Sequence, residues 1–124
     1  EMTGQTIKTV LEDVCDNLFN PDPYYQQGGD MVRVGGLHYS CDPTARMGNR
    51  IGDMRLNGKL IDAQKKYKVA GWAPVAEEAR TAGNPQVWEV VETWLKARGG
   101  KVSPRKANQP TLTGGLPNPG FSAG

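Results

Sequence analysis

The 124-residue sequence has one histidine, only two cysteines and no long hydrophobic segment. No apolar run approaches the roughly 20 residues that a transmembrane helix needs, so the sequence predicts no membrane-spanning helix. Cys15 and Cys41 have no CxxC spacing and no accompanying histidine cluster, which disfavours a structural zinc site. The two residues fit either a disulfide or two buried free thiols. His38 and Cys41 lie three apart on a predicted strand and would face opposite ways, which disfavours a Cys-His nucleophilic pair.

Complete phosphate and metal motifs are missing too. The glycine-rich stretches 28–30 and 35–36 lack the Lys-Ser/Thr of a Walker loop, and no predicted helix start follows them. The carboxylates of Asp30, Asp42 and Asp53 show neither EF-hand nor histidine-carboxylate spacing. We interpret these aspartates as turn-capping or surface residues.

Charge is distributed unevenly along a chain whose net charge is +2. No acidic residue follows Glu92, whereas several basic residues follow position 95: Lys96, Arg98, Lys101, Arg105 and Lys106. A basic tail on a mildly acidic body fits a solvated segment, and it also fits contact with nucleic acid or an acidic partner.

Two groups of side chains are compatible with ligand binding. Arginine guanidinium groups suit planar anions, and three of them fall in or beside one predicted loop, although a solvated face explains them equally: Arg46, Arg50 and Arg55. Trp72 ends a predicted strand, where it would be either a core or interface residue or a wall of an anion or ligand pocket.

A first helix is predicted over residues 3–19, because apolar residues recur at helical spacing: Ile7, Val10, Leu11, Val14 and Leu18. Thr3 fits the N-cap, and the Asn-Pro-Asp-Pro segment 20–23 ends the helix. Acidic residues should lie mostly on the opposite side (Glu12, Asp13 and Asp16), with Cys15 at the edge of the apolar stripe.

A second helix is predicted to begin with Asn84 as N-cap and Pro85 in the first turn, and to end before Gly99 and Gly100. Its apolar face would contain Val87, Val91, Trp94 and Leu95, widened by Trp88 and Val90.

Several short strands are predicted between the helices. Alternating apolar residues indicate strands at 31–34 and 37–41. A hairpin is predicted with its turn at Asn57-Gly58, and a further strand is predicted over 67–72. This order predicts an α+β fold with a mixed or antiparallel sheet flanked by helices. Residues 1–102 would form the domain, and the Pro- and Gly-rich tail 103–124 would be extended or disordered.

Three stretches together resemble a known family. "EMTGQTIKTVLE" (1–12) is similar to a Met-Thr-Gly turn that leads a strand into a helix. "VRVGGLHYSCDPTARMGNRIGDMRLNGKLID" (32–62) and "KKYKVAGW" (65–72) are similar to the Gly-Leu-x-Tyr and Tyr-Lys-Val-Ala strands of the same family. The family is that of the 5′-nucleotidase C-terminal domain, whose N-terminal partner is a metallophosphoesterase-like domain. The resemblance covers residues 1–76.

The chain departs from the nucleotidase pattern after the Tyr-Lys-Val-Ala strand. Nucleotidases of this family continue with an aromatic residue that stacks on the base, followed by Gly-Gly-Asp-Gly. Residues 71–86 read "GWAPVAEEARTAGNPQ" instead, so a base-stacking clamp is not expected. This replacement, together with residues 20–43, is similar to the thiosulfohydrolases of the bacterial Sox sulfur-oxidation pathway.

That resemblance implies a function for the whole enzyme. Two manganese ions in the N-terminal domain would hydrolyse sulfate from a cysteine-S-thiosulfonate carried by a SoxYZ-type carrier protein in the periplasm. The present chain would be the substrate-side domain, without catalytic residues or metal ligands of its own and inactive alone, with Trp72 and Arg80 facing the carrier. The alternatives are a 5′-nucleotidase or UDP-sugar hydrolase domain, and a non-enzymatic interaction module that uses the basic tail.

Overall fold

The computed structural model describes the whole chain except residues 30, 71–82, 105–107 and 115–124. The chain divides into two compact units, one formed by residues 1–67 with 107–124 and the other by residues 68–106. Each unit is described by itself. No helix among the described residues is both long and apolar enough to cross a bilayer.

The first unit contains the predicted N-terminal helix, α1 (Gly4–Phe19). The Thr3 hydroxyl accepts a hydrogen bond from the Thr6 amide at 3.1 Å, which confirms Thr3 as the N-cap. The helix ends where the Asn20 amide donates to the Asp16 carbonyl, directly before the first proline of the predicted stop. A short 3-10 helix, η1 (Pro23–Tyr25), follows.

A four-stranded sheet lies against α1. Its strands are β2 (Leu37–Cys41), β3 (Ile51–Leu56), β4 (Lys59–Leu60) and β6 (Thr111–Leu112), in the order β4-β3-β2-β6. β3 is antiparallel to both of its neighbours, whereas β6 is parallel to β2. Asn57 and Gly58 both have positive φ, as the predicted tight hairpin turn requires. The predicted α+β class with a mixed sheet is confirmed.

The remaining strand pair is short. β1 (Met2–Thr3) runs antiparallel to β5 (Lys66–Tyr67), with Met2 opposite Tyr67. Of the strand predicted over 67–72, only Tyr67 forms a strand among the described residues, and positions 71 and 72 lie outside them. The prediction of a strand at 31–34 was wrong, because only Val34 forms an isolated bridge, with Asn108.

Part of the tail joins the sheet. Thr111 and Leu112 pair with Ser40 and Cys41, and the Thr113 amide donates to the Cys41 carbonyl at 2.9 Å. Thr111 and Leu112 are therefore extended and belong to the sheet. The domain boundary after residue 102 stays a prediction.

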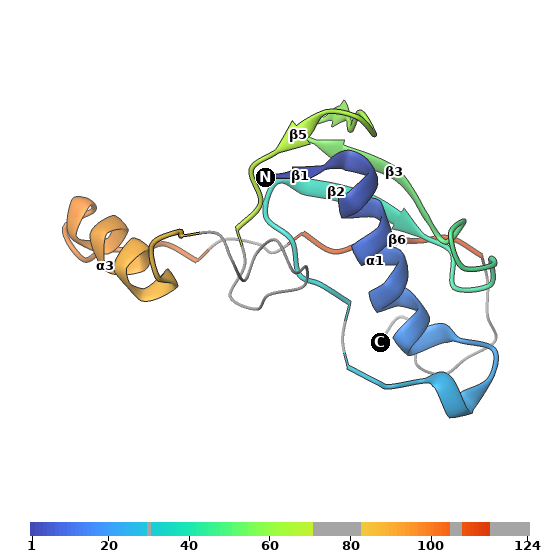
Figure 1. Ribbon diagram of the computed structural model, residues 1–124. Coiled ribbons are helices and arrows are strands. Elements are labelled where there is room, and N and C mark those ends of the chain that lie inside the picture. The colour runs from blue at the N-terminus through green and yellow to red at the C-terminus, as the bar shows by residue number, and fades with distance from the viewer. Residues whose placement is uncertain (30, 71–82, 105–107, 115–124) are drawn as a thin grey trace. The chain divides into compact units, whose positions relative to one another are not determined.

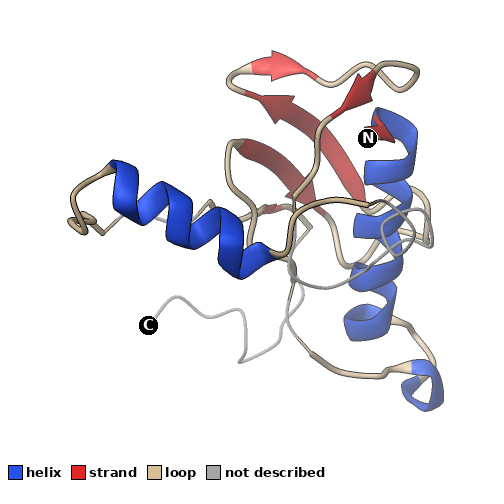
Figure 2. Ribbon diagram, turned by 60° about the vertical axis from the view of Figure 1, so that its left-hand side comes forward, coloured by secondary structure: helices blue, strands red, loops and turns tan. Residues whose placement is uncertain are grey.

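Figures 1 and 2 show α1 beside the sheet from two directions, and the core of this unit is formed by residues of both. Its buried residues are Leu11, Cys15, Leu37, Tyr39, Cys41, Ile51 and Met54. Two expectations for α1 were wrong: Cys15 is fully buried rather than at the edge of the stripe, and Glu12 is buried rather than on a polar side. The helix is rotated so that these residues face the sheet.

The second unit contains α3 (Val87–Ala97). The predicted start was wrong, because Gln86 is the N-cap and forms a capping box with Glu89. The end was predicted correctly: the Gly99 and Gly100 amides donate to the carbonyls of Lys96 and Leu95, and both glycines have positive φ.

Candidate functional site

The two residues predicted to face the substrate, Trp72 and Arg80, lie outside the described residues. The structure shows what holds the segment that leads to them. β5 pairs with β1, and the amides of Gly4 and Gln5 donate to the carbonyls of Lys65 and Ala63 at 3.0 and 2.9 Å. The chain therefore leaves the first unit from a point fixed against the start of α1.

The turn into α1 leaves no room for a side chain at Gly4. A Cβ atom built on Gly4 would lie 2.2 Å from the Asp62 carbonyl oxygen and 2.5 Å from a methyl group of Ile61. The Asp62 amide in turn donates to the Tyr67 hydroxyl at 2.9 Å. Segment 61–67 can pack over the helix start because residue 4 has no side chain.

A buried carboxylate joins α1 to the loop between β2 and β3. One Glu12 oxygen accepts from the Gly48 amide at 2.8 Å and the Arg50 amide at 3.3 Å. The other accepts from the Ile51 amide and the Lys8 ammonium, both at 2.8 Å. Burial alone would raise the pKa of Glu12. The hydrogen bonds from Lys8 and the backbone amides lower it by more than burial raises it, so the pKa of Glu12 is below its usual value.

Arg50 strengthens the same connection. Its guanidinium donates to the Ala45 carbonyl at 2.8 Å, to the Asp16 carboxylate at 2.6 Å and to the Phe19 carbonyl at 3.2 Å, with 3% of the side chain exposed. Hydrogen bonds from Asn20 and from Arg50 lower the pKa of Asp16. The sequence analysis did not predict that Glu12 and Arg50 connect α1 to this loop, because helical periodicity placed Glu12 and Asp16 on a polar face.

The three-arginine anion site does not assemble. Arg50 is used inside the unit, and Arg55 pairs with Asp53 at 2.8 Å on the surface. Arg46 is exposed. Asp42 accepts from the Thr44 amide at 2.9 Å and so caps a turn, as expected.

No group of three or more histidine, cysteine, aspartate or glutamate side chains is placed to hold a metal ion in the part of the chain that the structure describes. Asp30, one of the carboxylates considered from the sequence, lies outside the described residues.

The cysteines and the histidine occupy opposite sides of β2. His38 is exposed, whereas Cys41 is buried with its sulfur 3.1 Å from the sulfur of Cys15, and both thiols are free. The hydrogen bond to Cys41 and burial raise the pKa of Cys15 far above its usual value, so this thiol is a poor nucleophile. Burial likewise raises the pKa of Tyr39 to about 12. No Cys-His pair forms.

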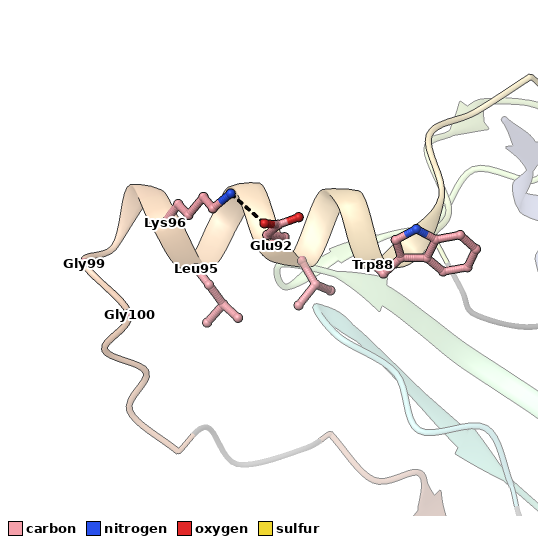
Figure 3. Close-up of a pocket in the computed structure, with 7 residues that line it drawn as sticks. Trp88, Glu92, Leu95, Lys96, Gly99 and Gly100 are labelled. Atoms are coloured by element: carbon pink, nitrogen blue, oxygen red, sulfur yellow. Dashed lines mark ion pairs between the residues drawn. The ribbon is translucent and has the colours of Figure 1, made fainter.

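An apolar hollow runs along α3 in the second unit (Figure 3). It is lined by the apolar side chains of Trp88, Val91 and Leu95 and by Gly99 and Gly100. Glu92 and Lys96, which form an ion pair at 2.5 Å, line it too. Trp88 is 64% exposed. An isolated helix of 11 residues is marginal in water, so its apolar face is a candidate contact surface.

Trp94 belongs to another part of the predicted apolar face. The Arg98 guanidinium lies over its ring, 4.4 Å from the centroid. This contact places a cation over the indole ring, and Trp94 is not among the residues that line the hollow.

Comparisons with known proteins agree with this fold. The sequence model of the 5′-nucleotidase C-terminal domain matches residues 1–80. The solved structure of the Thermus thermophilus sulfate thiohydrolase SoxB in complex with glycerol is similar at a TM-score of 0.75 and 33% identity. That match covers 93% of this chain and 22% of the SoxB chain, so this chain spans less than a quarter of that protein. No curated protein matches.

Proposed function

This chain belongs to the 5′-nucleotidase C-terminal domain family, and we propose from that premise that it is the substrate-side domain of a thiosulfohydrolase. The full enzyme would release sulfate from a cysteine-S-thiosulfonate on a SoxYZ-type carrier protein in the bacterial periplasm. An N-terminal metallophosphoesterase-like domain would contain the reaction centre.

One observation carries this proposal over the other activities of the family. The family match ends at residue 80, whereas the similarity to SoxB covers 93% of the chain and therefore continues well beyond that residue. Most of the residues that follow Tyr67 are therefore within the similarity to a sulfate thiohydrolase. The same region lacks the Gly-Gly-Asp-Gly sequence of nucleotidases, and a thiosulfonate has no base to stack.

The two manganese ions of this proposal do not fit the described part of the chain. None of its carboxylates, cysteines or the histidine forms a cluster of three, so the ions would be held by the N-terminal domain. There they would supply a Lewis acid and an activated water. The work of the present domain would be to bind the carrier peptide and to orient its anionic end.

Trp72 and Arg80 are the proposed contacts for the carrier. In the full-length enzyme, Trp72→Ala and Arg80→Ala should each raise KM for the loaded carrier roughly tenfold with little change in kcat, because uniform binding energy is lost. Steady-state kinetics measure this effect. Tyr24→Ala and Arg46→Ala are matched controls, since both residues are exposed and lie in other segments. Unchanged KM in folded Trp72 and Arg80 variants would contradict the assignment.

A nucleotidase or UDP-sugar hydrolase activity remains the alternative that the family match favours. Release of phosphate from AMP, or of UMP and a sugar 1-phosphate from a UDP-sugar, by the full-length enzyme without sulfate release from the carrier would establish it.

A non-enzymatic module that binds through the basic tail is a third candidate. Deleting residues 103–124 would be a poor test, because β6 belongs to this segment and pairs with β2. Replacing Lys101, Arg105 and Lys106 by glutamine removes three of the five positive charges that follow position 95 and keeps the strand. A tail-binding module would then lose its partner, whereas the thiosulfohydrolase would keep its turnover.

A further inference from the structure

We propose that Cys15 and Cys41 form a disulfide that joins α1 to β2 when the protein folds in the presence of a disulfide oxidant. The two sulfur atoms are 3.1 Å apart, and neither side chain is exposed to solvent. This inference concerns the chain itself and does not rest on the proposed activity.

The backbone on both sides fixes the two sulfurs as neighbours. Cys41 is held between two strands, opposite Ile51 of β3 and Leu112 of β6. Cys15 lies on α1, and hydrogen bonds of Glu12 and Arg50 hold this helix against the loop after β2. A bond of ~2 Å requires the sulfurs to approach by about 1 Å, which small changes of the side-chain torsions supply.

The reaction balances as two successive thiol–disulfide exchanges. One cysteine thiolate attacks the oxidant, a small-molecule disulfide or a thiol oxidoreductase, and displaces one thiol. The second cysteine then attacks the mixed disulfide and displaces the other thiol. The protein loses two protons and two electrons, and the oxidant becomes two thiols.

Burial sets when this exchange occurs. An oxidant cannot reach sulfurs with no exposed surface, so the folded dithiol reacts slowly. The disulfide therefore forms before the core closes, and once formed it is shielded from reductants. It closes a loop whose ends are 26 positions apart and restricts the unfolded chain accordingly.

Peptide mapping of the full-length protein tests the proposal. The protein is refolded once with reduced and oxidised glutathione and once with dithiothreitol. It is then denatured in the presence of iodoacetamide, which alkylates free thiols, and digested with trypsin. Lys8, Arg33 and Arg46 place the two cysteines in different peptides, 9–33 and 34–46. We expect these peptides joined, two hydrogens lighter than their sum, after oxidative refolding. Separate, alkylated peptides after oxidative refolding would overturn the proposal, as would either cysteine joined to another partner.

Thermal unfolding gives a second readout. The oxidised protein should unfold at a Tm on the order of 10 °C above that of the reduced protein. Cys41→Ala should abolish this difference, and a difference that survives in Cys41→Ala would assign it to other cysteines and contradict the proposed effect. If Cys41→Ala does not fold, the peptide map of the unmodified protein decides.

Discussion

At the scale of single residues, two buried charged side chains hold the first unit together. Glu12 accepts hydrogen bonds from two backbone amides of the loop between β2 and β3 and from the Ile51 amide at the start of β3, and Arg50 donates hydrogen bonds to α1. Buried charges are tolerable only when fully paired, as these are. Their role could not be predicted from the sequence, because helical periodicity treats a glutamate beside Leu11 as a solvent-facing residue and cannot show which distant amides need an acceptor.

Replacing Glu12 by glutamine should lower the free energy of unfolding by about 2–4 kcal/mol, since an amide nitrogen would replace an acceptor oxygen among buried donors. The shift of the urea unfolding midpoint of the full-length protein measures this, and amide exchange at Gly48 and Ile51 should accelerate. Glu92→Gln is the control, because its side chain is 63% exposed and its loss should matter little. Equal stability of the two variants would contradict the anchoring role.

The same carboxylate predicts a pH dependence. Its folded pKa is below the ordinary value of 4.5, so its contribution to stability is fully present above that value and is lost as the pH falls through the folded pKa. The stability difference between the unmodified protein and Glu12→Gln should therefore be constant near neutral pH and shrink below about pH 4.5. Urea unfolding over pH 3–7 checks the sign, and a difference that grows on acidification would refute it.

At the scale of elements, local signals were sufficient for caps and turns. The Thr3 cap, the proline stop after α1 and the Asn57-Gly58 turn depend on neighbouring residues and were predicted correctly. β6 was not predicted as a strand, because its partner β2 lies far away in the sequence and the surrounding composition is that of a tail. The start of α3 was misplaced because the Gln86–Glu89 capping box prevailed over the Asn-Pro pair before it.

The turn between β1 and α1 gives a prediction at this scale. Gly4→Ala should destabilise the protein by roughly 1–3 kcal/mol, because its Cβ would meet the Asp62 backbone. Gly35→Ala is the matched control, since nothing lies within 4 Å of its Cβ position. Thermal unfolding of the two full-length variants separates them, and a Tm for Gly4→Ala equal to that of Gly35→Ala would contradict the close approach.

At the scale of the whole molecule, the fold class could be predicted from the order of helices and strands, and the family from three ordered motifs. The match over residues 1–80 and the similarity to SoxB bear both out. The substrate-facing residues could not be reached in the same way. Trp72 and Arg80 were assigned from resemblance, and they lie outside the described residues. In the proposed enzyme their role would depend on the N-terminal domain as well, and the similarity covers only 22% of the SoxB chain.

The most direct test of the account is the product released by the full-length enzyme with added Mn²⁺. Sulfate release from a thiosulfonate-loaded carrier would be measured beside phosphate release from AMP under the same conditions. We predict sulfate without phosphate, because the region after Tyr67 lacks the Gly-Gly-Asp-Gly sequence of nucleotidases and most of that region is within the similarity to a sulfate thiohydrolase. Phosphate release without sulfate release would contradict the account and make Trp72 a candidate for stacking on a base.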